Sequence, residues 1–421
     1  MARFLHLADV HLGFDRYDNK ERTKDFFLAF QDALHRYALV EQVDFVVIAG
    51  DLFEHRMIQP HILNQAQVCL QDLQAAGIPV VAIEGNHDNR PYGSKTSWLR
   101  YLADWGLLIL LEPGNPTNGE PLYEPWDTDV RRGGYIDLNC DVRIVGSFWY
   151  GASAPRAIAT LAEGIQSLPS GPAHTVMLFH HGLEGQIARY QGALRYSDLL
   201  PLKQAGVDYL ALGHIHKNYA VEGWIFNPGS LEANSIEEST YERGAYLVQL
   251  GSDGMQAELK RDYYQRPVVR LRISLRGQES LEEVEQLAEQ QVKTAIQTQK
   301  LRPEQRPIVE LRIEGQVGFD RLELDIRKLQ QSLQYLSQAL IFLLRYDADT
   351  VTYQTPLTEE AGRFQVEREV FTDLLAANAT YRKQADNLIQ TLIELKDLSL
   401  QEKSEADLYN FVYGLLNSTK E

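Results

Sequence analysis

The sequence predicts an α/β fold in which a largely parallel sheet is covered by helices. Short apolar runs at 43–49 and 78–83 have the length and composition of strands buried on both faces. Residues 23–40 carry apolar side chains at helical spacing, so we expect a helix lying on the sheet there, and a second helix at about 61–75. Polar side chains follow each predicted strand, and ligands bind at this carboxyl edge in sheets of this kind.

The first two predicted strands each end in side chains that can bind a metal. Asp9 and His11 close the first strand, where alternation along an extended chain would point both side chains to one face. Asp51 follows the second strand. A single Asp after a strand is most often a helix cap, but capping does not explain polar side chains after three successive strands.

The loop Gly85-Asn86-His87-Asp88 follows the third strand and concentrates three functional side chains. Gly85 is expected to allow a sharp turn at the strand end. Asn86 offers a neutral oxygen to a metal, His87 can exchange a proton near neutral pH, and Asp88 can hold the imidazole in position. Taken alone, the same residues also suit an ordinary turn.

Histidines follow two further predicted strands. The elements expected in this part are a Pro-, Gly- and Asp-rich surface loop at 112–141 and strands at 142–149, 175–179, 207–213 and 245–250, the last of which closes the domain. His180 and His181 stand at the end of the second of these strands, and His214 and His216 follow the third. An H-x-H pair on an extended chain puts both imidazoles on one face, a common metal-chelating arrangement.

The composition limits the chemistry and the compartment. The pooled candidates are two Asp, one Asn and four His without a thiolate, a set that suits Mn²⁺, Fe²⁺ or Zn²⁺. Seven ligands exceed one tetrahedral site and fit two metal ions that share a carboxylate. The net charge of −17 disfavours a protein that coats nucleic acid unaided, but bound metal ions would reverse the field felt by a phosphate substrate. Two cysteines, no apolar run long enough to cross a bilayer and no signal-peptide pattern predict a cytoplasmic protein without a membrane segment.

Taken together, these motifs resemble those of the calcineurin-like metallophosphoesterases. The matching motifs, in the family's order, are Asp9-x-His11, Gly50-Asp51, Gly85-Asn86-His87-Asp88, His180 and Gly213-His214-x-His216. Residues 9–13, 50–53, 213–217 and 228–232 look like the subgroup of SbcD-type nuclease subunits of DNA double-strand-break repair complexes. The resemblance implies an α/β (α+β) fold, built as a four-layer β-sandwich flanked by helices, for a catalytic domain that we place at 1–262.

The resemblance also implies a role for each candidate residue. The first metal would be held by Asp9, His11 and His216, the second by Asn86, His180 and His214, and Asp51 would bridge the two. His181 is kept as an alternative to His180. His87 would stabilise the transferring phosphate or protonate the leaving oxygen, with Asp88 orienting it. The expected cofactors are two divalent ions, with Mn²⁺ as the expected metal.

One position departs from the family. Archaeal and eukaryotic relatives have a His directly after the Asp-Leu-Phe piece, and that His contributes to exonuclease activity. Here the position is Glu54, and His55 comes one residue later. Both residues are kept as candidate substrate-binding groups. Either Glu54 is an ordinary loop acid with His55 at the surface, or exonuclease trimming is weak while other diester hydrolysis persists.

The chain beyond the catalytic part is expected to form a small α+β module resembling the capping domain of SbcD-type nucleases, at 263–350. Its expected strands are 268–275, 308–313 and 340–345, and its helices are 279–298 and 320–338. Arg270 and Arg272 alternate with apolar residues, so one strand face is basic. That face is either simply solvated or a contact for the phosphate backbone of DNA.

The last segment, 356–421, is expected to be helical and to bind a partner. Its three apolar stripes are Phe364 with Phe371, Leu374 and Leu375; Leu388, Ile389, Leu392, Ile393 and Leu395; and Leu408, Phe411, Val412, Leu415 and Leu416. Short amphipathic helices bury little surface alone, so they either fold back on the cap or dock on a partner. The resemblance implies an SMC-like ATPase of the SbcC type as that partner and leaves a homodimer open.

These inferences lead to one main functional prediction and two rivals. The main prediction is a metal-dependent DNA phosphodiesterase, an exo- or endonuclease acting in DNA repair as the nuclease subunit of a complex with an SMC-like ATPase. The first rival is a small-molecule phosphodiesterase or phosphatase that uses the same site. The second is a mainly structural subunit of the ATPase complex.

Overall fold

The computed structural model describes residues 1–114, 121–187, 192–252, 254–317, 319–350, 367–368, 370–371, 385–401 and 405–418. The chain divides into two compact units, Met1–Val268 and Val269–Glu421. The division falls shortly after position 262, where the sequence predicts the end of the catalytic domain.

Two six-stranded sheets form the centre of the first unit. The first sheet has the order β12-β11-β1-β2-β3-β4. Its strands are β1 (Ala2–Leu7), β2 (Phe45–Ala49), β3 (Val80–Ile83), β4 (Ile109–Leu110), β11 (Ala245–Gly251) and β12 (Gly254–Lys260). Strands β1 to β4 run parallel, and β11 and β12 add antiparallel strands at one edge.

The second sheet has the order β5-β6-β7-β8-β10-β9. Its strands are β5 (Tyr135–Leu138), β6 (Val142–Val145), β7 (His174–His180), β8 (Tyr209–Gly213), β9 (Tyr219–Val221) and β10 (Ile225–Asn227). Strands β6, β7, β8 and β10 are parallel, while β5 and β9 pair antiparallel at the two edges. Both sheets therefore present the carboxyl ends of several parallel strands.

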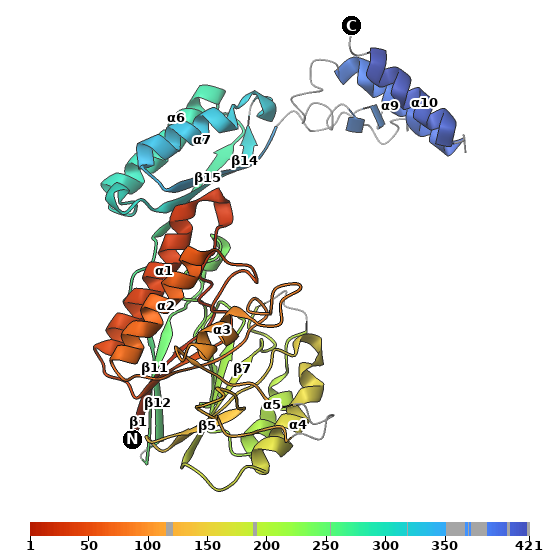
Figure 1. The fold of residues 1–421 in the computed structure, drawn as a ribbon. Coiled ribbons are helices and arrows are strands. Elements are labelled where there is room, and N and C mark those ends of the chain that lie inside the picture. The colour runs from red at the N-terminus through yellow and green to blue at the C-terminus, as the bar shows by residue number, and fades with distance from the viewer. Residues whose placement is uncertain are drawn as a thin grey trace. The chain divides into compact units, whose positions relative to one another are not determined.

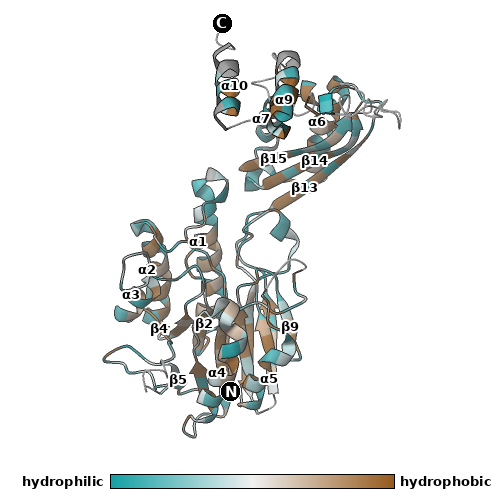
Figure 2. Ribbon diagram, turned by 90° about the vertical axis from the view of Figure 1, so that its right-hand side faces the viewer, coloured by the Kyte–Doolittle hydropathy of each residue, from teal (hydrophilic) through white to brown (hydrophobic). Residues whose placement is uncertain are grey.

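Helices cover the outer face of each sheet. Helices α1 (Lys20–Leu34), α2 (Pro60–Ala75) and α3 (Trp98–Asp104) share one apolar core with the first sheet, and α4 (Ala154–Gln166) and α5 (Tyr196–Gln204) share another with the second. A third core lies between the sheets, where Phe4 stacks on Phe45 and Tyr209 stacks on Phe226. In Figure 1, α1 and α2 accordingly lie on one side of the strands of this unit and α4 and α5 on the other, and hydrophobic colour gathers on central strands such as β2 in Figure 2. The expected four-layer sandwich is confirmed.

Two sequence-based expectations for the edges were wrong. Strand β5 lies inside the segment 112–141 that was expected to be loop, because it pairs antiparallel with β6 and the carboxylate of Asp137 accepts from Arg143 at 2.7 Å. The expected strand 142–149 is correspondingly shorter. Residues 245–250 do not close the sheet, since β12 pairs with β11 along its whole length. Edge strands have weaker apolar patterns than central ones, which is why the sequence misses them.

The second unit contains a three-stranded sheet covered by two helices. Its elements are β13 (Val268–Arg276), α6 (Leu281–Gln297), β14 (Ile308–Val317), α7 (Ile326–Ser337) and β15 (Ile341–Thr350), in the sheet order β13-β14-β15. Helix α6 begins with a capping box, in which the Ser280 side chain accepts from the N–H of Glu283 and Glu283 accepts from the N–H of Ser280. Apolar side chains from all five elements form one core.

Two helices follow in the C-terminal part, α9 (Ala385–Leu400) and α10 (Glu405–Ser418), and they contact each other. Ile389 and Ile393 of the second predicted stripe are buried and pack with Phe371. Phe364, Leu374 and Leu375 lie outside the described residues. Among the helices that the structure describes, none has the length and apolar character needed to cross a membrane.

Candidate metal centre

The candidate ligands gather where the parallel strands of the two sheets end. Asp9 and His11 follow β1, Asp51 follows β2, and Asn86 follows β3, all in the first sheet. In the second sheet, His180 is the last residue of β7, and His214 and His216 follow β8. Residues far apart in the chain are thus placed in neighbouring loops by the topology of the sheets.

The backbone at these positions is not extended, contrary to the sequence-based expectation. Asp9, His11, Asp51 and His214 have φ angles of 51°, 52°, 54° and 85°, which lie in the left-handed region. Alternation therefore does not place Asp9 with His11 or His214 with His216. Instead, the loops after β1 and β2 continue to pair, with the N–H of His11 donating to the carbonyl of Asp51 at 3.1 Å. Positive φ in four residues that are not glycine is strained, and such strain clusters at functional sites.

Two glycines make room for the ligands. A Cβ at Gly50 would overlap the ring of His180, and Gly50 also has a φ of 91°. A Cβ at Gly85 would overlap the carboxylate of Asp51. Gly85 has no positive φ, so its role is to let the Asp51 side chain approach rather than to make the sharp turn that the sequence suggested.

Asp9, His11 and His216 form the first group of donor atoms. The Nε2 atoms of His11 and His216 lie 3.1 Å apart, and they lie 3.9 and 4.0 Å from Oδ1 of Asp9. The other ring nitrogen of each histidine faces a carboxylate: Nδ1 of His11 is 2.7 Å from Oε2 of Glu54, and Nδ1 of His216 is 3.2 Å from both oxygens of Glu238. Three donor atoms thus face one point, and a carboxylate lies on the far side of each histidine ring.

Asp51, His180 and His214 form the second group, with Asn86 beside them. Nε2 of His180 lies 3.2 Å from Oδ2 of Asp51 and 3.2 Å from Oδ1 of Asn86. Nδ1 of His214 lies 2.8 Å from the same Asn86 oxygen. His180 donates its Nδ1–H to the carbonyl of Ala49 at 2.7 Å, which leaves the lone pair of Nε2 directed toward the group.

His180, His214 and His216 have displaced pKa values in the metal-free protein. Burial lowers the pKa of His180, but Asp51 outweighs this effect and the pKa is raised to about 9. Burial is likewise outweighed for His216, where Glu238 raises the pKa to about 9. Burial and the neighbouring His180 lower the pKa of His214 to about 3. A metal ion must displace the protons of His180 and His216, so metal affinity is expected to fall with falling pH.

The pKa values of the two carboxylates, Asp9 and Asp51, are displaced in opposite directions although burial raises both. Burial raises the pKa of Asp9 above its ordinary value, and the neighbouring histidines only partly oppose this. For Asp51 burial is outweighed by His180, which holds the pKa below its usual range. Buried carboxylates and imidazoles without a thiolate are donors that divalent metal ions accept, so this set of residues fits such ions.

Asp88 does not orient His87, which corrects the sequence-based expectation. The buried Asp88 carboxylate accepts from the backbone N–H groups of Leu52, Phe53 and Gly85 at 3.0–3.2 Å, and thereby ties the loops after β2 and β3 together. Burial raises the pKa of Asp88 to about 7. His87 is oriented instead by Glu54, whose backbone carbonyl accepts its Nδ1–H at 2.6 Å.

The alternative ligand His181 directs neither ring nitrogen toward the group. Its Nδ1 lies 3.1 Å from the carbonyl of Gly182, and its Nε2 lies 3.1 Å from the carbonyl of Gly151. Carbonyl oxygens only accept hydrogen bonds, so both nitrogens are turned to acceptors. The geometry favours His180 as the ligand at this strand end.

The predicted substrate-binding residues occupy different environments. Glu54 is not a free loop acid, because its carboxylate also lies 3.9 Å from Nδ1 of His87 in addition to its contact with His11. His55 is half exposed, with Nε2 3.3 Å from Oδ1 of Asp15. The contacts of Glu54 were missed because they depend on the fold. The same holds for Glu238, which no motif marks.

Arg270 and Arg272 belong to the second unit, and both are ion-paired there. Nε of Arg270 lies 2.8 Å from the buried Glu310, which also contacts Arg345 at 2.7 Å. Nε of Arg272 lies 3.5 Å from Glu314. The open face of this sheet therefore carries acids as well as arginines, which weakens the expectation of a purely basic strand face.

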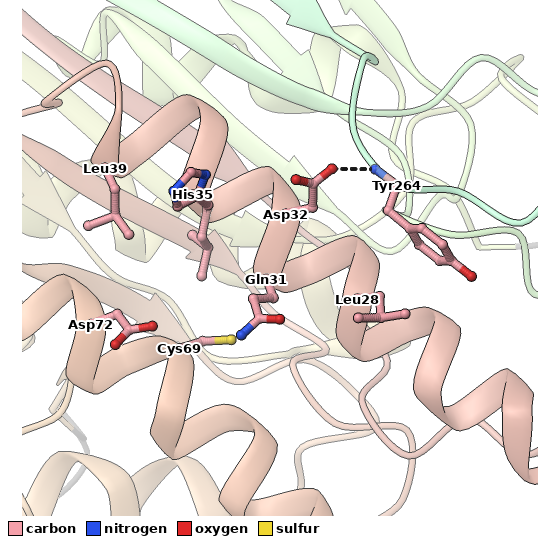
Figure 3. A pocket seen from close by; sticks show the side chains of 9 residues that line it. Leu28, Gln31, Asp32, His35, Leu39, Cys69, Asp72 and Tyr264 are labelled. Atoms are coloured by element: carbon pink, nitrogen blue, oxygen red, sulfur yellow. Dashed lines mark hydrogen bonds between the residues drawn. The ribbon is translucent and has the colours of Figure 1, made fainter.

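A cavity in the first unit lies away from these ligands. It has a volume of about 490 Å³ and is lined by residues of α1, α2 and the π-helix His35–Leu39 that follows α1. Tyr264 also lines it, and its N–H donates to Asp32 at 2.7 Å (Figure 3). None of its lining residues belongs to the two donor groups. The chemistry of the protein is therefore expected at the strand ends and not in this cavity.

The sequence matches a known protein family over the part of the chain that carries the residues of the two donor groups. Residues 2–218, just over half of the 421 residues, match the family of calcineurin-like phosphoesterases. The chain belongs to this family. Calcineurin-like phosphoesterases use divalent metal ions, and the two donor groups described above are candidate positions for such ions. His11 also lies within reach of Glu54 and His87, which makes a third group of possible donors.

Three archaeal relatives carry the name DNA double-strand break repair protein Mre11. The protein of Archaeoglobus fulgidus is 32% identical over 244 residues, which cover 56% of this chain and 52% of the relative. The protein of Aeropyrum pernix is 30% identical over 283 residues, covering 65% and 64%. That of Sulfolobus acidocaldarius is 23% identical over 352 residues, covering 81% and 82%. The matches to the first two thus span only about half to two thirds of those relatives.

Proposed function

We propose that this protein is a metal-dependent phosphodiesterase that cleaves DNA as an exo- or endonuclease. The observation that carries the proposal is the convergence of two donor groups, Asp9 with His11 and His216, and Asp51 with His180 and His214, at one edge of the two sheets. The names of the archaeal relatives support DNA as the substrate class.

Each residue of the centre has a proposed task. Asp9, His11 and His216 would hold one ion, Asn86, His180 and His214 would hold the other, and Asp51 would bridge them. Two divalent ions, with Mn²⁺ proposed, would supply Lewis acidity and an activated water for in-line attack on phosphorus.

His87 is the proposed group that contacts the phosphate. Its Nδ1–H is used by the Glu54 carbonyl, so Nε2 is the nitrogen left to face a substrate oxygen. The side chain is 36% exposed, which suits a group that meets substrate from solvent. Asp88 is proposed as a positioning residue that fixes the loop carrying His87, through its three backbone hydrogen bonds.

We further propose that the protein acts in DNA repair, in the cytoplasm, with an SMC-like ATPase. The C-terminal helices are the proposed docking element, and residues 263–350 the proposed cap. In support, α10 exposes Tyr409, Val412 and Tyr413, and the two tyrosines stack with ring centres 6.1 Å apart. An exposed aromatic and apolar face of this kind is typical of an interface.

The deciding experiment is cleavage of end-labelled single-stranded and duplex DNA by the purified protein, in Mn²⁺, with and without a candidate ATPase. A chromogenic phosphodiester is assayed in parallel. The proposal predicts Mn²⁺-dependent release of nucleotides or fragments, lost in Asp51→Asn. Hydrolysis of the small diester without any DNA cleavage would point to a small-molecule phosphodiesterase, and neither activity would point to a structural subunit.

A further inference from the structure

Glu238 faces the rear of the His216 ring. Both of its carboxylate oxygens lie 3.2 Å from Nδ1 of His216, on the side opposite to the Nε2 that meets His11. We infer that Glu238 is a positioning residue: its carboxylate accepts the Nδ1–H of His216 and so presents the lone pair of Nε2 to the first metal position. The inference rests on the proposed two-metal centre and adds to it a residue outside all the motifs.

Glu238 is itself held in place before any metal arrives. Its Oε2 accepts the N–H of Asn234 at 2.9 Å, and its own N–H donates to Oγ of Ser235 at 3.3 Å. Its carbonyl accepts from Nη1 of Arg243 at 2.8 Å. The side chain is only 21% exposed. A carboxylate fixed in this way orients the imidazole without a further loss of side-chain freedom on metal binding.

The two donor groups differ in the residues that contact the second ring nitrogen of their histidines. In the first group, Nδ1 of His216 faces Glu238 and Nδ1 of His11 faces Glu54, but the latter pair lacks hydrogen-bond geometry despite its 2.7 Å separation. In the second group, His180 is held by the carbonyl of Ala49. Loss of Glu238 is therefore expected to weaken the first metal position and to leave the second unchanged.

A selective effect on the first metal position distinguishes a positioning role of Glu238 from a merely structural one. A residue that only stabilised its loop would lower the free energy of unfolding, or affect both metal positions together. A positioning residue changes the affinity of one of the two positions. Its effect is restored by a neutral acceptor of similar shape, because the oxygen of Gln can accept the same N–H.

The experiment is a calorimetric titration of the metal-free, full-length protein with Mn²⁺, supported by electron paramagnetic resonance of the loaded protein. The variants are Glu238→Ala and Glu238→Gln, with Glu163→Ala as the matched control on the exposed face of α4. Thermal unfolding of each metal-free variant checks the fold. Should Glu238→Ala fail to fold, Glu238→Leu, which fills the space without an acceptor, takes its place in the titration.

The parent is expected to bind two Mn²⁺ ions and to show a spin-coupled pair. Glu238→Ala should bind one of them about 10- to 100-fold more weakly, so that at limiting Mn²⁺ its spectrum is that of isolated ions. Glu238→Gln should stay within about 3-fold of the parent, because it keeps the acceptor but loses the charge. Parental affinity at both positions in Glu238→Ala, or equal weakening of both, overturns the inference while the two-metal centre stands. A parent that binds no pair of ions overturns both.

Discussion

Replacing Asp51 by Asn should abolish phosphodiester hydrolysis while preserving the fold. The Asp51 backbone has a φ of 54°, and Asn is among the few residues that adopt this left-handed conformation readily. Oδ1 of Asp51 accepts the N–H of His87 at 2.8 Å, and the amide oxygen of Asn can accept it in the same way. The substitution therefore removes a charge and little else, which Asp51→Ala would not do.

The magnitude follows from the charge that the proposed centre would lose. Two divalent ions bring four positive charges, and the proposed ligands contain only two carboxylates, Asp9 and Asp51. Removal of one preorganised electrostatic group typically costs about 10²- to 10³-fold in kcat, or about 3–4 kcal/mol. Because Asp51 would contact both ions, we expect a loss of at least about 10³-fold. The metal-free protein should lose about 1–3 kcal/mol of stability through the missing contact with His180, less than a folded domain's total of about 5–15 kcal/mol.

The assay is single-turnover hydrolysis of a chromogenic phosphodiester in Mn²⁺, with the bound metal counted and the fold checked by circular dichroism. Asp262→Asn is the matched control, since the side chain of Asp262 is 97% exposed. The control should retain the parent rate. Near-parental turnover in Asp51→Asn with two metal ions still bound would refute the assignment of Asp51 as the bridge.

Three further predictions address the other parts of the molecule. Deleting 356–421 should leave hydrolysis of the small diester intact and abolish binding of the ATPase in a pull-down; an insoluble product would show instead that the helices pack on their own chain. Glu54→His should lower small-diester turnover about 10-fold, because the carboxylate that it removes contacts His11. Unchanged small-diester turnover with faster trimming of duplex ends would instead support the idea that Glu54 merely repels the substrate. The pKa of buried His6 is lowered from 6.5 to about 3, chiefly by burial, so the folded protein keeps this ring neutral while the unfolded chain takes up a proton as the pH falls through 6.5. This contribution to stability is complete above pH 6.5 and is lost progressively toward pH 3, by about 2 kcal/mol between pH 7 and 5. In His6→Gln, the free energy of unfolding measured in urea should therefore fall by about 2 kcal/mol less over that pH range than in the parent. The same pH dependence in both proteins would contradict this prediction.

The sequence predicts the site better than the edges of the fold. Central strands such as β2 and β3 are apolar on both faces, and polar residues after them stand out against that background. The edge strands β5 and β12 alternate, and their partners are recognised only once the sheet is assembled. The residues that gather at the site are thus predictable from local pattern and order along the chain.

The reasons why those residues meet are not local. We expected alternation on an extended chain to bring Asp9 and His11 together. In the structure both residues have left-handed backbone conformations, and their loop is hydrogen-bonded to the loop after β2. The partner of His87 is a backbone carbonyl and not Asp88. Both differences arise from hydrogen bonds between loops of separate strands, for which a single sequence holds no signal.

The two donor groups can face each other only if the two sheets keep a fixed separation. His6 contributes hydrogen bonds that connect the two sheets. From β1 its Nε2–H donates to the carbonyl of Leu212 in β8 at 3.0 Å, because a carbonyl can only accept. Its Nδ1 must then accept from the hydroxyl of Tyr209 at 2.9 Å, so the neutral ring satisfies both nitrogens across the two sheets. Leu212 lies two residues before His214, and His6 three residues before Asp9. The backbone N–H of His214 donates to both carboxylate oxygens of Asp9, at 3.0 and 2.9 Å, and so joins the loops after β8 and β1. The neutral, buried His6 thus fixes the separation of β1 and β8, whose ends carry ligands of the two groups. Protonation of His6 would remove the acceptor at Nδ1 and oppose this packing of the two sheets, on which the centre depends.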